Sequence, residues 1–172
     1  MILRKNAFWD RVRRVLSIIL NLIVVRVEPI AIRMSWEAVG EQTLTFYTEN
    51  SNLFSAAVCL LVAVCQVWAL FTGRELPRWV KRLKFLAACC LTMTFLTVVF
   101  VLAPYYPDQG GVFFLLTESS MLYHHLINPL CVFISFVFLE REPRLSARNI
   151  PLALIPTMVY GAIALWANVQ RL

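Results

Sequence analysis

Five long apolar stretches, separated by short polar linkers, make up most of this chain. They cover residues 15–34, 51–71, 85–102, 121–139 and 151–167. Each is close to the roughly 20 residues that a helix needs to cross a bilayer, and the linkers are too short to form a soluble domain. The pattern predicts an all-α fold, a polytopic membrane helix bundle of about five transmembrane helices in a single domain over residues 1–172.

The charged residues alternate between the two sides of this bundle. Basic residues precede the first stretch and fill the second and fourth linkers: Arg4, Lys5, Arg11, Arg13, Arg14, Arg74, Arg78, Lys81, Arg82, Lys84, Arg141, Arg144 and Arg148. Acidic residues occupy the other two linkers: Glu37, Glu41, Glu49, Asp108 and Glu118. The positive-inside rule then predicts a cytoplasmic N-terminus and an external C-terminus. The net charge of +6 is explained as a topology signal, so no nucleic-acid partner is expected.

The first stretch is the most interrupted, because Arg26, Glu28, Pro29 and Arg33 follow its apolar run. It has some features of a signal peptide, but no small-residue cleavage site follows it. Arg26 and Glu28 are expected to reach the membrane surface, to pair with each other or to contact the bundle. A proton- or solute-translocating role for these two residues is a third, minor hypothesis.

The two histidines of the chain, His124 and His125, lie inside the fourth apolar stretch. Polar side chains are costly in hydrocarbon, so an intramembrane histidine indicates a functional site. Pro129 follows four residues after His125 and cannot donate a backbone hydrogen bond to its carbonyl. The sequence predicts a kink in the helix at the histidines.

Polar residues also gather where the second stretch begins, at the same side of the membrane: Thr48, Glu49, Asn50, Ser51 and Asn52. A hydroxyl beside an imidazole is the smallest nucleophile and base pair, and Thr48 and His125 suit those roles. Asn52 could donate to an oxyanion, and Glu49 or Asn128 could orient the imidazole. In the structural alternative, Asn50 or Ser51 caps the helix, and the asparagines and histidines tie helices together.

No cofactor or metal is expected. The five cysteines, Cys59, Cys65, Cys89, Cys90 and Cys131, lie in the apolar stretches without a C-x-x-C spacing, as packing residues do. Adjacent histidines on a helix point about 100° apart, which does not suit a shared metal ion.

The stretch Phe46-Tyr-Thr-Glu-Asn-Ser-Asn-Leu53 resembles the F-[FY]-T-x-x-S-N-L signature of the androgen-induced (FAR-type) family of multipass membrane proteins and its bacterial relatives. The segment His125-Leu-Ile-Asn-Pro129, with the apolar run ending in Glu140, is similar to the H-x-x-x-P helix of that family. The animal members are threonine hydrolases of fatty acid esters of hydroxy fatty acids. The resemblance implies Thr48 as nucleophile and His125 as base, although the spacing in animal members points to His124.

This resemblance favours a threonine-nucleophile lipid-ester hydrolase that acts near the outer leaflet of a bacterial cell (inner) membrane. Its supporting residues would be His124, Glu49, Ser51, Asn52 and Asn128, and its partner a membrane lipid or a lipid-ester substrate. The family has six spans, so a second copy of the chain or another protein could supply the missing helix. The alternative is a non-catalytic membrane protein that binds a lipid or a partner protein, with the Thr/His/Asn cluster as interhelical hydrogen-bond glue.

Overall fold

The computed structural model describes residues 2–140 and 149–170, and these are helical almost throughout, with no strand. The long helices are α1 (Ile2–Val39), α2 (Tyr47–Thr72), α3 (Arg78–Thr97) and α7 (Asn149–Gln170). Between α3 and α7 in the chain, a further long helical segment is composed of four pieces and contains the fourth span. The pieces are α5 (Ser119–Met121), η5 (Leu122–Ile127), α6 (Asn128–Ile134) and η6 (Ser135–Leu139). Short helical segments continue the long ones: η1 (Gly40–Thr45) follows α1, and η2 (Val98–Leu102) and η3 (Ala103–Tyr105) follow α3. Two more, η4 (Pro107–Gln109) and α4 (Gly111–Thr117), connect the third and fourth spans.

Five of these helical segments are long and apolar enough to cross a membrane, so the expected all-α bundle is confirmed. The spans are Phe8–Thr45, Tyr47–Thr72, Arg78–Tyr105, Leu122–Leu139 and Asn149–Gln170. The first span is not broken at Arg26 to Arg33, because α1 continues through Pro29 to Val39. The interrupted apolar pattern therefore belongs to one long helix.

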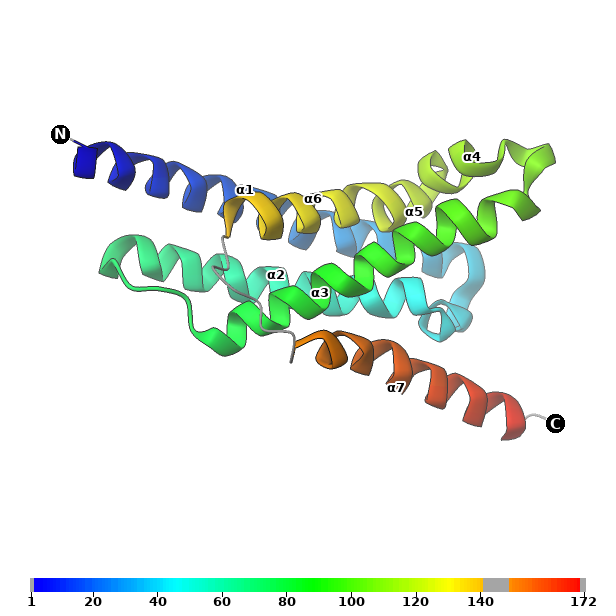
Figure 1. Ribbon diagram of the computed structural model, residues 1–172. Coiled ribbons are helices and arrows are strands. Elements are labelled where there is room, and N and C mark those ends of the chain that lie inside the picture. Colours follow the sequence, from blue (N-terminus) through cyan, green and yellow to red (C-terminus); the bar gives the residue numbers. More distant parts are fainter. Residues whose placement is uncertain (1, 141–148, 171–172) are drawn as a thin grey trace.

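Successive spans run in opposite directions (Figure 1). The first four pack against one another, and the fifth packs against the third. Both α1 and α3 pack against α2 and against α6, so these four helices enclose the interior of the bundle. The N-terminal part of α1, the α2–α3 loop and the end of η6 meet at one end, which we call the basic end. The connections η1 and η3–α4 lie at the opposite end.

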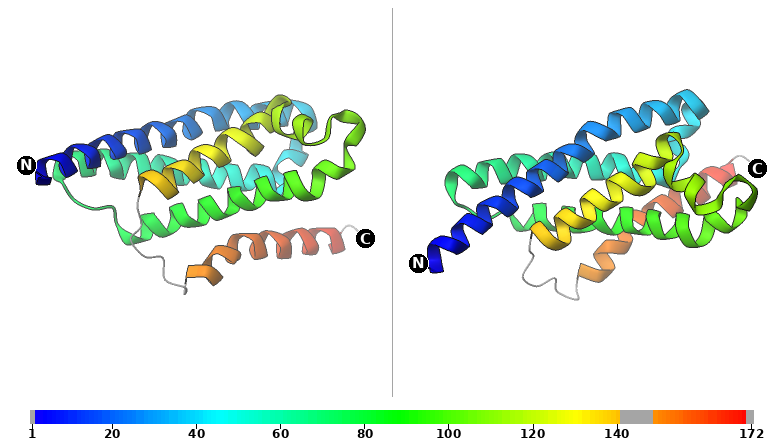
Figure 2. Two further views of the ribbon diagram at one scale, coloured as in Figure 1. Left: turned by 45° about the horizontal axis from the view of Figure 1, so that its top comes forward. Right: turned by 90° about the horizontal axis from the view of Figure 1, so that it is seen from above.

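The last helix, α7, stands at the edge of the bundle, beside α3 (Figure 2). Two hydrogen bonds attach it to the opposite end: Tyr47 Oη to Thr157 Oγ1 at 2.9 Å, and the Tyr160 hydroxyl to the Thr45 carbonyl at 2.7 Å. None of its described residues is buried. The residues that line the interior therefore come from the other four spans.

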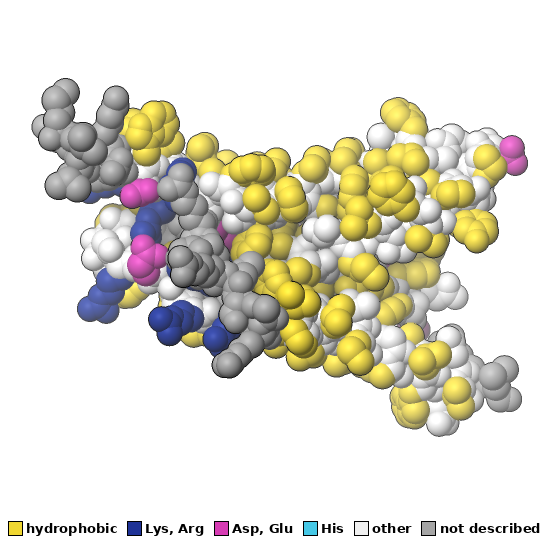
Figure 3. Space-filling view, viewed as in Figure 1, with side chains coloured by type: hydrophobic (Ala, Val, Ile, Leu, Met, Phe, Trp, Pro, Cys, Tyr) yellow, Lys and Arg dark blue, Asp and Glu magenta, His cyan; other side chains and the backbone are white. Residues whose placement is uncertain are grey.

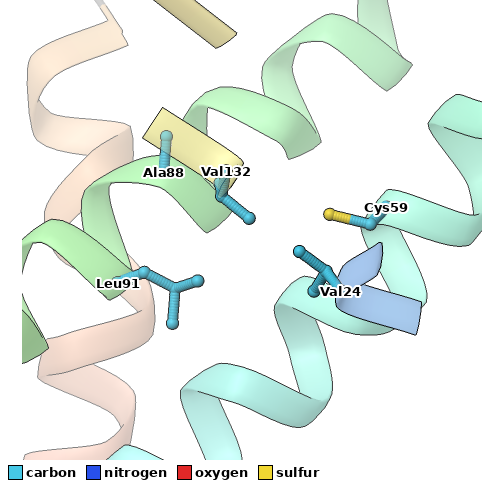
Figure 4. Close-up of a cluster of buried hydrophobic side chains, with 5 residues drawn as sticks. All are labelled: Val24, Cys59, Ala88, Leu91 and Val132. Atoms are coloured by element: carbon cyan, nitrogen blue, oxygen red, sulfur yellow. The ribbon is translucent and has the colours of Figure 1, made fainter. Parts of the chain in front are cut away.

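The bundle is apolar outside and partly polar inside, as in membrane proteins rather than soluble ones. Lys and Arg side chains gather at the basic end, while hydrophobic side chains cover most of the rest of the visible face (Figure 3). At mid-depth, Val24, Cys59, Ala88, Leu91 and Val132 from four helices point toward one another (Figure 4). Buried polar residues lie on both sides of this apolar layer.

The fourth span departs from a regular α-helix at the position that the sequence predicted. The stretch Leu122–Ile127, which holds both histidines, is π-helical and directly precedes α6 with Pro129 in its first turn. Upstream, the chain breaks at Glu118 and Ser119, and Ser119 takes a positive φ of 48°, which is uncommon for a non-glycine residue. This break folds α4 back toward the histidines. Such π-helical turns are frequent at functional sites.

Candidate functional site

A polar cluster, here the histidine cluster, lies between the apolar layer and the opposite end. It consists of Glu28 on α1, Glu49 and Asn52 on α2, and His124 and Asn128 on the fourth span, all buried. The Asn128 amide donates to Glu28 Oε2 at 2.8 Å and to Asn52 Oδ1 at 3.0 Å. The Asn52 amide donates to the His124 carbonyl at 3.3 Å and to the Thr48 carbonyl at 2.9 Å. The two motifs that carry the resemblance are therefore in direct contact.

His124 lies between two carboxylates. Its Nε2 is 3.4 Å from Glu28 Oε2, and its Nδ1 is 4.0 Å from Glu49 Oε1. The Ser35 hydroxyl also donates to Glu49 Oε1, at 3.2 Å. Carboxylate oxygens accept hydrogen bonds, so both nitrogens of His124 face acceptors. Because both nitrogens face carboxylates, neither is positioned to act as the base for a hydroxyl group.

His125 points elsewhere and has a different partner. Its Nδ1 lies 2.7 Å from the carbonyl oxygen of Leu115 on α4. A carbonyl can only accept, so Nδ1 carries a hydrogen, and in the neutral ring Nε2 then keeps its lone pair. No hydrogen bond to His125 Nε2 occurs within the described residues. The neutral tautomer with a free Nε2 is the one that a general base requires.

Thr48 lies in the first turn of α2 and is half-buried. Its carbonyl accepts from the Ser51 hydroxyl at 2.9 Å and from Asn52. In the part of the chain that the structure describes, its own hydroxyl makes no hydrogen bond, to either imidazole or to any other group. The structure thus brings Thr48 to the edge of the histidine cluster and leaves its hydroxyl free.

The suggested supporting residues have identifiable partners. Both amide hydrogens of Asn52 are engaged, so in this state it positions the motif instead of donating to an oxyanion. Glu49 and Asn128 contact the His124 side of the cluster, and a backbone carbonyl orients His125. Neither Asn50 nor Ser51 is the N-cap of α2, which is Phe46. The Asn50 amide instead donates to the Leu44 and Phe46 carbonyls at 2.8 Å.

Several buried polar atoms of the cluster have no hydrogen-bond partner among the described residues. They are Glu28 Oε1, Glu49 Oε2, His124 Nε2 and Asn128 Oδ1. An unsatisfied buried polar group costs roughly 1–3 kcal/mol and is therefore rare without a reason. Four such atoms in one cluster indicate a site that interacts with water or with polar groups of a ligand.

A second polar cluster, the lysine cluster, lies between the apolar layer and the basic end. Lys84 Nζ donates to Asn21 Oδ1 at 2.6 Å and lies 3.7 Å from Glu140 Oε1. The same carboxylate oxygen accepts from the Ser17 hydroxyl and the Asn21 amide, both at 2.9 Å. Gln66 donates to Ser17 Oγ at 2.8 Å. These five residues join α1, α2, α3 and the end of the fourth span.

The lysine cluster corrects the interpretation of Lys84 as a loop charge. Lys84 lies inside α3, and its side chain is 1% exposed. Glu28 is also buried, which its sequence position did not indicate. It does not pair with Arg26, because Arg26 is exposed and the Asn128 amide donates to Glu28. Of the basic residues assigned to topology, Arg141, Arg144 and Arg148 lie outside the described residues.

Within the described ranges, no group of three His, Cys, Asp or Glu side chains is arranged to hold a metal ion. All five cysteines have free thiols. Comparisons of the chain with protein-family models, with curated proteins and with solved structures found no match. The functional interpretation therefore depends on the geometry of the two polar clusters.

Proposed function

We propose that this multi-pass membrane protein hydrolyses lipid esters, with Thr48 as nucleophile and His125 as general base. The observation that supports this most is the 2.7 Å hydrogen bond from His125 Nδ1 to the Leu115 carbonyl, which leaves Nε2 available to accept a proton when the ring is neutral. A second support is the contact of Asn52 with both Thr48 and His124, which places the two motifs at one site. Catalytic hydrogen bonds are often long or absent before substrate binds.

The chemistry follows ordinary acyl transfer. Thr48 Oγ1 attacks the ester carbonyl carbon while His125 Nε2 takes the hydroxyl proton. The C–O bond of the ester breaks, and the proton passes from His125 to the leaving alcohol. Water then attacks the acyl-Thr48 ester, gives a proton to His125, and releases the fatty acid as Thr48 recovers its hydrogen. The apolar surroundings would limit access of bulk water.

The oxyanion would be stabilised by the backbone at the start of α2. The first N–H groups of a helix lack partners within the helix and carry the positive end of its dipole. Phe46, the N-cap of α2, provides no side-chain hydrogen bond to them. Thr48 lies in this first turn, so the attacked carbonyl oxygen could reach those N–H groups.

One observation favours the non-catalytic alternative, in which the cluster only ties helices together. Asn52 and Asn128 are fully buried and bond each other across helices, as interhelical glue would. In that case the protein would bind a lipid or a protein partner without turnover. Replacing the two histidines separately distinguishes the two functions.

We expect His125→Gln to lower ester turnover by about 10²–10⁴-fold, which is the usual contribution of a general base. His124→Gln should lower thermal stability instead, because it removes the ring between Glu28 and Glu49. Ester hydrolysis and thermal unfolding of both purified variants would be measured. Small and equal losses of turnover in the two variants would support the non-catalytic alternative.

The proposal includes an orientation, with the basic end in the cytoplasm and the site near the outer leaflet of a bacterial inner membrane. Single cysteines at positions 74 and 108 test it, in a background without the five native cysteines. A membrane-impermeant maleimide should label position 108 in intact cells and position 74 only after permeabilisation. The reverse pattern would contradict this orientation.

A further inference from the structure

The basic end contains a cavity that belongs to neither motif. Its volume is about 600 Å³, and its floor is formed by Gln66, Lys84 and Glu140 of the lysine cluster. Arg13 and Arg14 of α1 line one side, and Phe136 of the fourth span lines another. The cavity is separated from Thr48 and the histidines by the apolar layer around Val24. It is therefore a separate candidate site.

Both cationic and acidic side chains line this cavity. Among the described residues that line it, four are cationic and three are acidic. The arginines are turned inward, with side chains 21% exposed for Arg13 and 23% for Arg14. Their partners Asp10 and Glu75 lean outward, at 59% and 78% exposed. An anion in the cavity would therefore meet the half-buried guanidinium groups of Arg13 and Arg14.

Two residues that line the cavity each have a buried polar atom without a hydrogen-bond partner among the described residues. One is a donor, the Nε–H of Arg13, and the other is an acceptor, Oε1 of Gln66. Gln66 is 2% exposed, so its orphan oxygen is inside the bundle and not at its surface. A ligand that satisfies both atoms carries an anionic oxygen and a hydroxyl. Phosphodiesters with a hydroxylated headgroup have this combination.

The position of the cavity indicates that this ligand is a lipid. Leu139 is the last residue of the fourth span, and Arg13 lies near the start of the first, so the cavity lies at the level where headgroups meet the apolar core. Its wall includes Leu76 and Val137, beside which acyl chains could pack. We propose that this cavity binds the headgroup of an anionic glycerophospholipid of the phosphatidylglycerol type. This assignment is independent of the hydrolase proposal.

Binding would be measured by native mass spectrometry of the purified protein in a neutral detergent, with phosphatidylglycerol, phosphatidylcholine and diacylglycerol as separate probes. We expect retention of phosphatidylglycerol at least about tenfold above the other two, as expected for charge-assisted hydrogen bonds. Equal retention of phosphatidylcholine or diacylglycerol would overturn the proposal.

The matched variants are Arg13→Met and Arg82→Met. Arg82 lies on α3 near the same end but is exposed and does not line the cavity. Arg13→Met should lower phosphatidylglycerol binding about tenfold, and Arg82→Met should leave it unchanged. Equal losses in the two variants would show that general surface charge attracts the lipid and would overturn the proposal.

Two further measurements keep the test decisive. Should Arg13→Met fail to fold, Gln66→Met replaces it, since it removes the orphan acceptor with little change in volume and should also weaken phosphatidylglycerol binding. Unchanged binding in Gln66→Met would then count against the site. Glycerol phosphate and inorganic phosphate are added as soluble competitors. Displacement of the lipid by millimolar phosphate would assign the cavity to a free phosphate and not to a lipid.

Discussion

Replacing Lys84 by methionine should be among the most destabilising single changes in this protein. The variant keeps a similar volume but removes the ammonium that bonds Asn21 at 2.6 Å and lies 3.7 Å from Glu140. The Glu140 side chain is 9% exposed, so its charge would remain buried without a cationic partner within the lysine cluster. Breaking one partner of a buried pair typically costs about 3–5 kcal/mol of unfolding free energy. Thermal unfolding of the purified variant in detergent would measure the loss.

Two companion variants separate this electrostatic effect from packing. The double variant Lys84→Met/Glu140→Gln removes both charges and should recover much of the lost stability. Arg82→Met, two residues away but on the exposed face of α3, should change stability by no more than about 0.5 kcal/mol. The single variant Glu140→Gln completes the comparison. If the double variant loses as much unfolding free energy as Lys84→Met and Glu140→Gln together, the two charges do not interact as the distances indicate.

Replacing Thr48 by alanine should abolish ester turnover. Among the described residues, Thr48 provides the hydroxyl that lies in the first turn of α2 and makes no hydrogen bond. Ser51, the neighbouring hydroxyl, is already bonded to the Thr48 carbonyl and to Thr94. Loss of an enzyme nucleophile can lower kcat by about 10⁶-fold. Stability should change by less than about 1 kcal/mol, since the Thr48 hydroxyl makes no hydrogen bond within the described residues.

Thr45→Ala is the matched control for this prediction. Thr45 lies three residues earlier, is exposed, and donates its hydroxyl hydrogen to the Gln42 carbonyl. The Thr45→Ala variant should therefore hydrolyse the ester at the wild-type rate. Thr48→Ser should keep part of the activity, because it keeps the hydroxyl and loses only the methyl group that restricts its rotamer. Full activity in Thr48→Ala would exclude the threonine as nucleophile.

The helical architecture could be predicted from the sequence because hydrophobic length is a direct requirement of the bilayer. The polar interior was harder to predict, although parts of it are periodic. Asn52, Cys59 and Gln66 follow one another at seven-residue spacing, and all three are buried. Asn21, Val24 and Glu28 mark the same inner face of α1. This spacing was the available signal for Asn21 and Gln66, and it was obscured by the apolar residues around them.

Other features depend on contacts that the sequence does not contain. In the sequence, Lys84 closely follows the basic residues Lys81 and Arg82 near the start of α3. Only the packing of α1 and the end of the fourth span shows that Lys84 is inside the bundle. The partner of His125 is a backbone carbonyl from the short helix α4, which carries no side-chain signal. The difference between the two adjacent histidines therefore arises from tertiary structure.

The most direct test of the hydrolase proposal is to locate a covalent adduct. The purified protein would be treated with a fluorophosphonate, digested, and analysed by peptide mass spectrometry. We expect the added mass on the peptide that contains Thr48, with no adduct in Thr48→Ala and a strongly reduced one in His125→Gln. No adduct on the wild-type protein, under conditions in which a known membrane hydrolase is labelled, would contradict the proposal, as would equal labelling of Thr48→Ala.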